Sequence, residues 1–211
     1  MYNTFVLASA SPRRIELLKA TGVTFSSIAS SIDEEQLIQT LDRLAPDLLA
    51  QELAAAKAIA VSREHPGILV LGVDTLVALD EGILGKPADE QDAVSMLTKL
   101  SGREQIVYTG MVLTRDGREC SRAVEATTVA MRPLDRKEII EYVQREKPYD
   151  KAGAYAIQEG ARGFVEYYEG CYYNIVGLPL CRLEGLFHQC GVRLAIGPLP
   201  PACQPGGRVY L

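Results

Sequence analysis

Tryptophan is absent from this sequence, and histidine occurs only at positions 65 and 188. A His-based zinc site or a Ser-His-Asp triad is therefore poorly supplied. The five cysteines are an odd number and include no CxxC pair of metal-binding spacing. Reduced thiols in a cytosolic protein are the simpler interpretation of such cysteines.

Long apolar runs and an excess of basic residues are also lacking. No run reaches the roughly 18 apolar residues that a membrane-spanning helix needs. The apolar run at residues 6–8 is too short for a secretory leader, and residues 9–14 interrupt it. Lysine and arginine number 22 against 27 acidic residues, which gives a net charge of −5. We therefore expect a cytoplasmic protein that binds neither a membrane nor a nucleic acid, although a local basic pocket could still hold a small anion.

Length and composition predict one compact domain. The chain has 211 residues, of which 47% are hydrophobic and 23% charged, as in ordinary globular proteins. A chain of this size can bury a sizeable core without disulfides or a structural metal. We expect the domain to cover residues 1–197. The Pro- and Gly-rich tail, residues 198–211, is expected to be frayed.

Apolar patterning alternates between helices and strands along the chain. Helices are expected from Ser11 to about Gly22 and at residues 45–64, 89–99, 135–145 and 179–188. Strands are expected at residues 5–8, 68–79, 106–114 and 124–131, and as a hairpin of residues 164–168 and 171–176. This order predicts an α/β protein with a mixed sheet.

Two arginines stand in the first turn of the helix that Ser11 opens. Cations at this end oppose the helix dipole by about 0.3–1 kcal/mol each. A bound phosphate would reverse that sign, because backbone N–H groups, the Ser9 hydroxyl and the guanidinium groups of Arg13 and Arg14 would converge on it. The alternative is an exposed arginine pair that only solvates the helix end, and we favour the phosphate site.

Asp74 is the only charged residue within the apolar run at residues 68–79. A carboxylate inside such a strand costs several kcal/mol unless it is paired or binds a metal. A strand-end aspartate that closes a turn is the alternative, but Asp80 already fills that role. We therefore expect a functional Asp74 at the sheet edge, where catalytic groups sit.

Three further residues give weaker signals. Lys57 rises from the apolar stripe of its helix, which suits a functional ammonium and ordinary snorkelling equally well. Lys86 is held in a glycine–proline loop, for which an ordinary exposed turn is the simpler interpretation. Glu34 belongs to the acidic run 33–35, which could hold Mg²⁺, although acidic runs in loops are usually only solvated.

Gln158 ends a stretch of small residues that begins after Asp150. Its amide both donates and accepts hydrogen bonds, so it can read one edge of a nucleobase. This signal is weak when it is taken alone. Together, the cations, the strand-borne aspartate and the acidic run predict a polyphosphate substrate with a divalent metal.

Six short motifs, in this order, resemble the Maf (septum formation) family over about residues 5–191. They are residues 7–14 (Leu-Ala-Ser-Ala-Ser-Pro-Arg-Arg), 72–75 (Gly-Val-Asp-Thr), 85–87 (Gly-Lys-Pro), 101–103 (Ser-Gly-Arg) with Tyr108 and Thr109, 150–155 (Asp-Lys-Ala-Gly-Ala-Tyr) and 176–179 (Val-Gly-Leu-Pro). The opening motif is distinctive, and six motifs in the right order leave little room for coincidence.

The resemblance implies both a fold and an activity. The implied fold is a mixed, strongly bent sheet between two α/β lobes with a central cleft, as in inosine triphosphate pyrophosphatases. The implied activity is hydrolysis of a nucleoside triphosphate to the monophosphate and pyrophosphate, with Mg²⁺ or Mn²⁺ as cofactor, in a cytoplasmic homodimer. The implied roles are catalysis by Asp74, Lys57 and Lys86, substrate binding by Ser9, Arg13, Arg14, Thr75 and Gln158, and metal binding by Glu34.

Arg13, Thr75 and Gln158 resemble the dTTP/UTP pyrophosphatase branch of the family rather than its 7-methyl-GTP branch. One alternative is a pyrophosphatase for 7-methyl-GTP or another modified nucleotide. The other is a nucleotide-sensing regulator of cell division that does not turn over its ligand. The residues leave open whether Asp74 deprotonates water or holds the metal.

The chain departs from the family pattern at three positions. Val73 stands where the family usually has alanine, Gln105 where it has histidine, and Glu159 where it has glycine. None of these departures removes a catalytic position. Glu159 directly follows Gln158, so the backbone of the base pocket is where a difference is expected.

Overall fold

The computed structural model describes residues 4–80, 82–197 and 207–211, and its centre is one mixed sheet. The strand order is β2-β1-β3-β5-β6-β7-β8, with β4 paired to β3 outside this path. The β1–β2 and β1–β3 pairs are parallel and the others are antiparallel. The strands are β1 (Phe5–Ala8), β2 (Phe25–Ser27), β3 (Leu69–Leu79), β4 (Gly82–Leu84), β5 (Glu104–Arg115), β6 (Arg118–Met131), β7 (Val165–Glu169) and β8 (Arg208–Tyr210). The predicted α/β class with a mixed sheet is confirmed.

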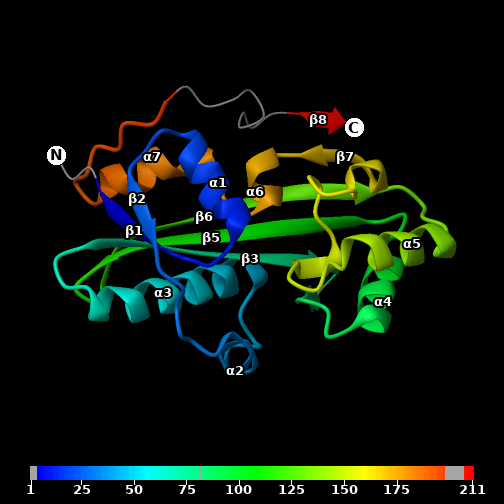
Figure 1. Cartoon of the computed structure of the whole chain (residues 1–211), viewed down its shortest axis with the longest axis horizontal. Coiled ribbons are helices and arrows are strands. Elements are labelled where there is room, and N and C mark those ends of the chain that lie inside the picture. The colour runs from blue at the N-terminus through cyan, green and yellow to red at the C-terminus, as the bar shows by residue number, and fades with distance from the viewer. Residues whose placement is uncertain (1–3, 81, 198–206) are drawn as a thin grey trace.

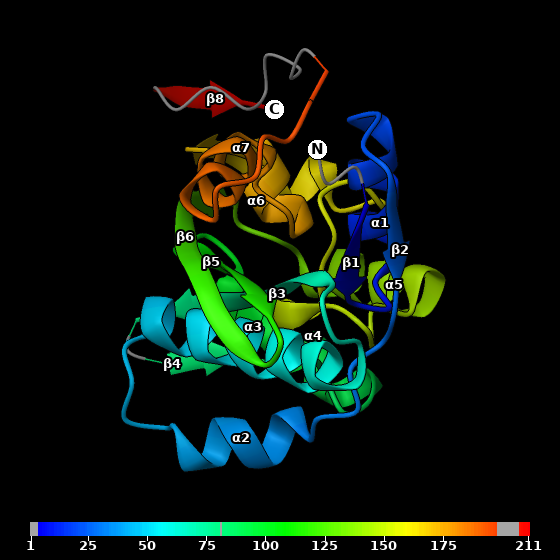
Figure 2. The same ribbon diagram turned by 90° about the vertical axis from the view of Figure 1, so that its left-hand side faces the viewer.

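Helices cover both faces of the long strands β3, β5 and β6 (Figures 1 and 2). Helix α3 packs on one face, and α6 and α7 pack on the opposite one. Helices α4 and α5 pack against each other toward the far end of the same strands. The helices are α1 (Pro12–Ala20), α2 (Glu34–Thr40), α3 (Pro46–Glu64), α4 (Glu90–Leu100), α5 (Arg136–Glu146), α6 (Tyr172–Val176) and α7 (Leu180–Gln189).

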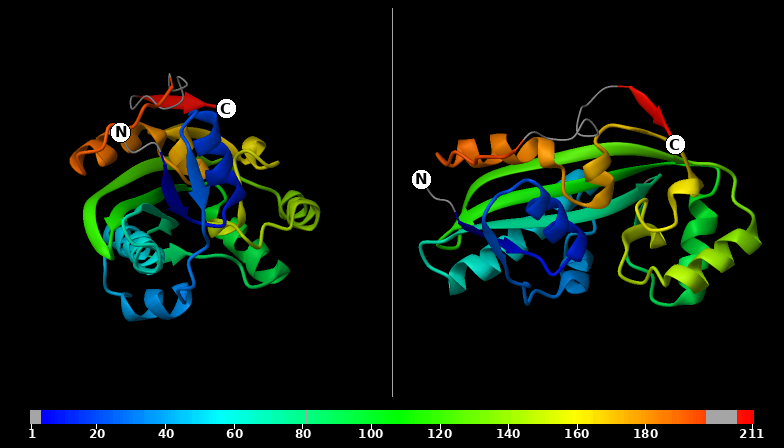
Figure 3. Two further views of the ribbon diagram at one scale, coloured as in Figure 1. Left: turned by 60° about the vertical axis from the view of Figure 1, so that its left-hand side comes forward. Right: turned by 45° about the horizontal axis from the view of Figure 1, so that its top comes forward.

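The three long strands join two groups of elements (Figure 3). One group contains β1, β2, α1 and α7, and the other contains α4 and α5. The main core continues through both, because buried side chains of β1, β3 and β5 and of helices from either group form one apolar cluster. This arrangement places the middle of β3 between the two groups.

Two glycines let helix α3 lie unusually close to the sheet. A Cβ atom on Gly72 would stand 2.0 Å from the carbonyl oxygen of Ala54, and one on Gly110 would stand 2.3 Å from that of Ala50. Any side chain larger than hydrogen would push the helix away from β3 and β5. The approach sets the height of Lys57, on the same helix, above the sheet.

The expected hairpin is wrong in its second half. Residues 165–169 form strand β7 as expected, but residues 172–176 form helix α6. The Asn174 side chain is fully buried on this helix, and its Nδ2 donates to the carbonyl oxygen of Val107 at 2.8 Å and to Thr127 Oγ1 at 2.9 Å. These hydrogen bonds join α6 to β5 and β6, which lie far away in the sequence, so no local pattern could predict the helix.

The expected frayed tail is wrong for residues 208–210, which form β8 on the edge of β7. The rest of the tail, residues 198–206, lies outside the described residues. Strand β2 and helix α2 were not expected, and α2 places the acidic run 33–35 at a helix start rather than in a loop. Among the described residues, no helix is long and apolar enough to cross a membrane.

Candidate active site

The site lies along one edge of strand β3. Strand β1 pairs with residues 70–72 of this edge, and β4 pairs with residues 77–79. Between them, residues 73–76 have no strand partner on this side in the described part of the chain. Asp74 and Thr75 stand in this interval, just beyond the carboxyl end of the parallel strand β1, which is where ligands bind in open α/β sheets.

A cavity of about 770 Å³ opens at this interval. It is lined by segments that lie far apart in the sequence, including the β1–α1 loop, the start of α2, the loop after β4 and residues 150–158. All nine residues predicted for the site line this one cavity. They are Ser9, Arg13, Arg14, Glu34, Lys57, Asp74, Thr75, Lys86 and Gln158.

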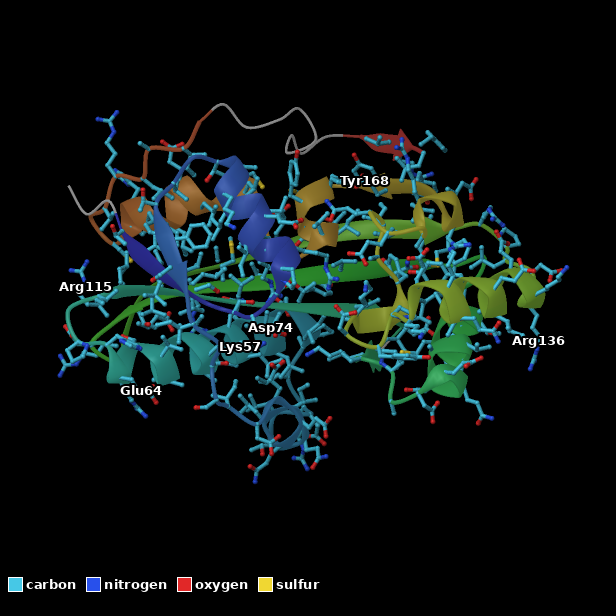
Figure 4. All side chains as sticks on the ribbon, viewed as in Figure 1. Lys57, Glu64, Asp74, Arg115, Arg136 and Tyr168 are labelled. Atoms are coloured by element: carbon cyan, nitrogen blue, oxygen red, sulfur yellow. The ribbon has the colours of Figure 1, made fainter. Side chains whose placement is uncertain are left out.

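Lys57 stands between two carboxylates. Its Nζ is 2.5 Å from Asp74 Oδ1 and 2.9 Å from Glu34 Oε2. Lys57 and Asp74 are both buried, and Figure 4 shows them side by side at the junction of α3 and β3. The ion pair accounts for the charge of Asp74 inside an apolar strand, and it excludes both the turn-closing aspartate and the snorkelling lysine.

Helix α2 supplies Glu34 from its first turn. Asp33 caps this helix by accepting a hydrogen bond from the backbone N–H of Gln36 at 2.9 Å. Burial acts to raise the pKa of Glu34, but the attraction and hydrogen bond of Lys57 outweigh it, so the pKa lies below its ordinary value of 4.5. Glu34 therefore stays ionised beside Lys57 at neutral pH.

Arg14 is fixed by three hydrogen bonds. Its Nε donates to the carbonyl oxygen of Gly177 at 2.9 Å, its Nη2 to Thr75 Oγ1 at 2.9 Å, and its Nη1 to Ser9 Oγ at 3.3 Å. Burial lowers the pKa of Arg14, and Asp74 and Glu34 oppose that effect. A guanidinium has five N–H donors, so two remain for an anion in the cavity.

Arg13 belongs to a closed ring of four charges at the rim of the cavity. Its Nη1 is 3.2 Å from Asp150 Oδ2 and 3.6 Å from Glu159 Oε1. Lys151 Nζ completes the ring, at 2.8 Å from Asp150 Oδ1 and 3.0 Å from Glu159 Oε2. Burial acts to raise the pKa of Asp150, but the hydrogen bond and charge of Lys151 outweigh it, so the pKa lies below its ordinary value. The ring fastens the loop that leads to Gln158 onto the start of α1.

Lys86 and Gln158 reach the cavity as exposed side chains. Sequence reasoning gave no role to Lys151 or to Thr109, whose hydroxyl is 3.0 Å from that of Thr75. Both stand inside motifs that were quoted for the resemblance, so position in a motif was the only available signal. The partners of Thr109, which are Thr75 and the backbone of Asn174, come from distant segments, whereas Lys151 pairs with Asp150 and Glu159 of its own loop.

Comparison with known proteins bears on what this cavity does. The family model described as Maf-like protein matches residues 4–190. The chain belongs to the Maf family. The match ends shortly before the described residues of the tail, so β8 lies outside the family's common region.

Several Maf relatives are similar over nearly their whole length. A protein of Symbiobacterium thermophilum is 44% identical over 91% of this chain and 96% of its own length. One of Geobacter metallireducens is 48% identical over 84% of this chain and 91% of its own length. One of Acetivibrio thermocellus is 45% identical over 89% of this chain and 95% of its own length. All three are named dTTP/UTP pyrophosphatase.

Proposed function

We propose that this chain hydrolyses dTTP and UTP to the nucleoside monophosphate and pyrophosphate. The observation that supports it most is the Asp74–Lys57–Glu34 cluster, in which Asp74 and Lys57 are buried, open to a cavity whose rim holds Arg13, Arg14 and Lys86. This arrangement places a general base, Asp74, close to the positively charged side chains that would bind the phosphates. The relatives' shared name, dTTP/UTP pyrophosphatase, supports the same reaction.

Binding of the triphosphate is assigned to the β1–α1 loop and the cations around it. The first turn of α1 contains no acidic residue, and among the described residues no side chain caps it. Its N–H groups and the Arg14 donors can therefore donate hydrogen bonds to phosphate oxygens. Lys86, from the loop after β4, would offset the charge that develops on the leaving pyrophosphate.

Asp74 is assigned the acid–base role. Hydrolysis breaks one phosphoanhydride bond and consumes one water, whose proton needs an acceptor. Asp74 Oδ1 already contacts the Lys57 ammonium, and its second carboxylate oxygen remains to take that proton or to orient the water. Lys57 then holds the carboxylate in place.

The residues of the cluster also fit a divalent cation. Two carboxylates, of Asp74 and Glu34, converge on one point, and Mg²⁺ is usually held by one or two carboxylates together with substrate phosphates. Among the described residues, no group of three or more His, Cys, Asp or Glu side chains could hold a metal alone. A bound Mg²⁺ or Mn²⁺ would neutralise phosphate charge. Lys57 would share the two carboxylates with it.

Recognition of the base is assigned to Thr75 and Gln158, with Arg13. Thymine and uracil present a keto oxygen that accepts and a ring N–H that donates, and one glutamine amide can answer both. Cytosine reverses this pattern and would leave a buried group unpaired, at about 1–3 kcal/mol. This polarity favours dTTP and UTP over CTP.

The deciding experiment is a screen of nucleoside triphosphates with Mg²⁺ and Mn²⁺. Release of pyrophosphate from dTTP, UTP, CTP, ATP and 7-methyl-GTP is measured for the wild type and for Gln158→Glu. We expect dTTP and UTP to give the highest kcat/KM, and the substitution to change the ranking. A preference for 7-methyl-GTP would move the chain to the other branch. Tight binding of every nucleotide without turnover would instead indicate a nucleotide sensor.

Two further parts of the proposal have no support from the geometry of the site. The first is a homodimer, which size-exclusion chromatography with light scattering tests directly. The second is a cytoplasmic location, where free nucleotides are available, and fractionation of expressing cells tests it.

A further inference from the structure

Thr109 lies directly beneath the site. It stands on β5 opposite Thr75 of β3, and the two Oγ1 atoms are 3.0 Å apart. Thr109 is fully buried, whereas the cavity is lined by Thr75. Thr75 therefore stands between Thr109 and the cavity.

Counting protons shows what Thr75 needs. A threonine hydroxyl has one proton to donate and two lone pairs to accept with. Thr75 Oγ1 accepts from Arg14 Nη2 at 2.9 Å, because a guanidinium only donates. The Thr75 proton points elsewhere, and two acceptors are in reach. They are Thr109 Oγ1 at 3.0 Å and the carbonyl oxygen of Gly177 at 3.5 Å.

Thr109 is the better acceptor of the two. The Thr109 hydroxyl donates its own proton to the carbonyl oxygen of Asn174 at 3.4 Å, which leaves its lone pairs for Thr75. The Gly177 carbonyl oxygen already accepts from Arg14 Nε at 2.9 Å, and it lies farther from Thr75. The chain of donation therefore runs from Arg14 to Thr75, then to Thr109 and to the backbone of α6.

We propose that Thr109 is a positioning residue that draws the Thr75 proton into the protein, so that Thr75 offers only a lone pair to the cavity. The identity of the base rests on the proposed function. A thymine or uracil ring N–H donates to that lone pair. The N3 of cytosine is itself an acceptor and meets another acceptor there. Thr109 thereby sets base selectivity without touching the base.

The first test measures selectivity. Thr109→Val keeps the branched shape and removes the hydroxyl, so the Thr75 proton becomes able to turn into the cavity and donate to cytosine. We expect the ratio of kcat/KM for dTTP to that for dCTP to fall about tenfold, as the loss of one hydrogen bond would give. The kcat for dTTP should change less than the ratio. Thr109→Ser restores a hydroxyl at the same place and is expected to restore the ratio.

Thr114→Val is the matched control. Thr114 lies on the same strand, is equally buried, and donates one hydrogen bond to the carbonyl oxygen of Ala58 at 3.1 Å. We expect this variant to lower Tm about as much as Thr109→Val while leaving the ratio at its wild-type value. If Thr109→Val also lowers Tm and leaves the ratio unchanged, Thr109 is only structural and the proposal is overturned.

A second test needs no turnover. In the proton NMR spectrum of the nucleotide-free protein, the Thr75 hydroxyl proton is expected to exchange slowly and to show a nuclear Overhauser effect to Thr109. Both features should vanish in Thr109→Val. A Thr75 hydroxyl proton that exchanges freely with solvent overturns the proposal even if dTTP is hydrolysed. The expected signals in a protein that does not hydrolyse dTTP would overturn the proposed function alone.

Discussion

Buried charges at this site stabilise one another. Lys57 and Asp74 are both buried, and removing one partner of such a pair typically costs about 3–5 kcal/mol. Glu34 gives Lys57 a second carboxylate at 2.9 Å. In the proposed reaction, the lysine would therefore keep a partner when Asp74 takes up a proton, so that no lone buried cation would be left.

Asp74→Asn removes the negative charge of this side chain and keeps its shape. We expect turnover of dTTP to fall by about 10²–10⁴, the usual cost of losing a general base. Glu34 still pairs with Lys57, so Tm should fall by only a few degrees. Pyrophosphate release and circular dichroism melting measure the two effects. Near-wild-type turnover would remove Asp74 from the reaction.

Glu34→Gln should make stability less dependent on acid pH. The pKa of Glu34 in the folded chain lies below its ordinary 4.5, so the unfolded chain takes up this proton first as the pH falls. The stabilisation that Glu34 provides is therefore complete above about pH 4.5 and is lost as the pH falls through the lower, folded value. Wild type should melt above the variant at pH 7, and the gap should close toward pH 3.

Glu35→Gln is the matched control for this pH series. Glu35 stands in the same first turn of α2, and its side chain is exposed. Both substitutions remove one negative charge beside the positive end of the helix dipole, so that contribution cancels in the comparison. A gap of equal size and pH dependence in both variants would contradict the role of the Lys57 pair.

Single residues of the site were predictable where each broke a local rule. Asp74 was conspicuous as a charge in an apolar strand, and Arg13 and Arg14 as cations at the positive end of a helix. Lys151 and Glu159 broke no such rule. Lys151 pairs with Asp150 and Glu159 inside its own loop, and Glu159 meets Arg13 only because that loop, more than a hundred residues along the chain, folds back onto α1.

At the scale of elements, the contact between α3 and β3 holds the site together. Gly72→Ala would place a Cβ atom 2.0 Å from the carbonyl oxygen of Ala54, so the helix must shift. We expect a loss of about 1–3 kcal/mol in unfolding free energy, as for overpacked cores. Turnover should fall as well, because α3 positions Lys57. Denaturant unfolding and pyrophosphate release check both.

Gly85→Ala controls for the change of glycine to alanine itself. A Cβ at Gly85 would meet nothing within 4 Å, and the residue lies beside Lys86 at the same cavity. The Gly85→Ala substitution should therefore leave the unfolding free energy nearly unchanged. Equal effects of the two substitutions would show that the close approach of α3 is not what keeps Lys57 in place.

Elements with a strong local signal were predictable, and elements made by distant contacts were not. Helices α4 and α7 follow apolar periodicity, whereas α3 and β3 follow from Ala- and Leu-rich or continuous apolar runs bounded by turn residues. Residues 172–176 contain β-favouring side chains and follow a Glu-Gly turn, which predicted a strand. The chain forms a helix there because Asn174 finds buried partners on β5 and β6. Strand β8 was missed for a similar reason, since its partner β7 lies some forty residues earlier.

At the scale of the whole molecule, the long strands bring the two groups of helices to one cavity. The β1–α1 loop enters from the β1 side, whereas the loop after β4 and residues 150–158 enter from the side of α4 and α5. Neither group contains a complete site. The distance between the proposed phosphate and base subsites is thus set by β3, which is continuous through both groups.

The tail tests how much of the chain the catalytic domain needs. Strands β5, β6 and β7 lie between β8 and the site strand β3, and the family match ends at residue 190. Deleting residues 198–211 removes three residue pairs with β7, together with the packing of Arg208 and Tyr210 on Tyr167 at 4.5 Å and 5.6 Å. The side chains of β8 are exposed, so we expect a loss of only about 1 kcal/mol and a Tm lower by about 2–4 °C. The kcat and KM for dTTP should not change.

Removing β8 has a second consequence, because it leaves the backbone N–H and C=O groups of β7 unpaired at the sheet edge. Such an edge is a template for pairing with another chain, so the shortened protein should self-associate more than the full chain. The full-length double variant Arg208→Ala, Tyr210→Ala loses the same side-chain contacts but keeps the backbone strand. Its Tm should lie between those of the deletion and the wild type, and its light scattering should match that of the wild type. Loss of turnover in the shortened chain at temperatures well below its Tm would instead make the tail a part of the catalytic domain, which would then extend beyond residue 197.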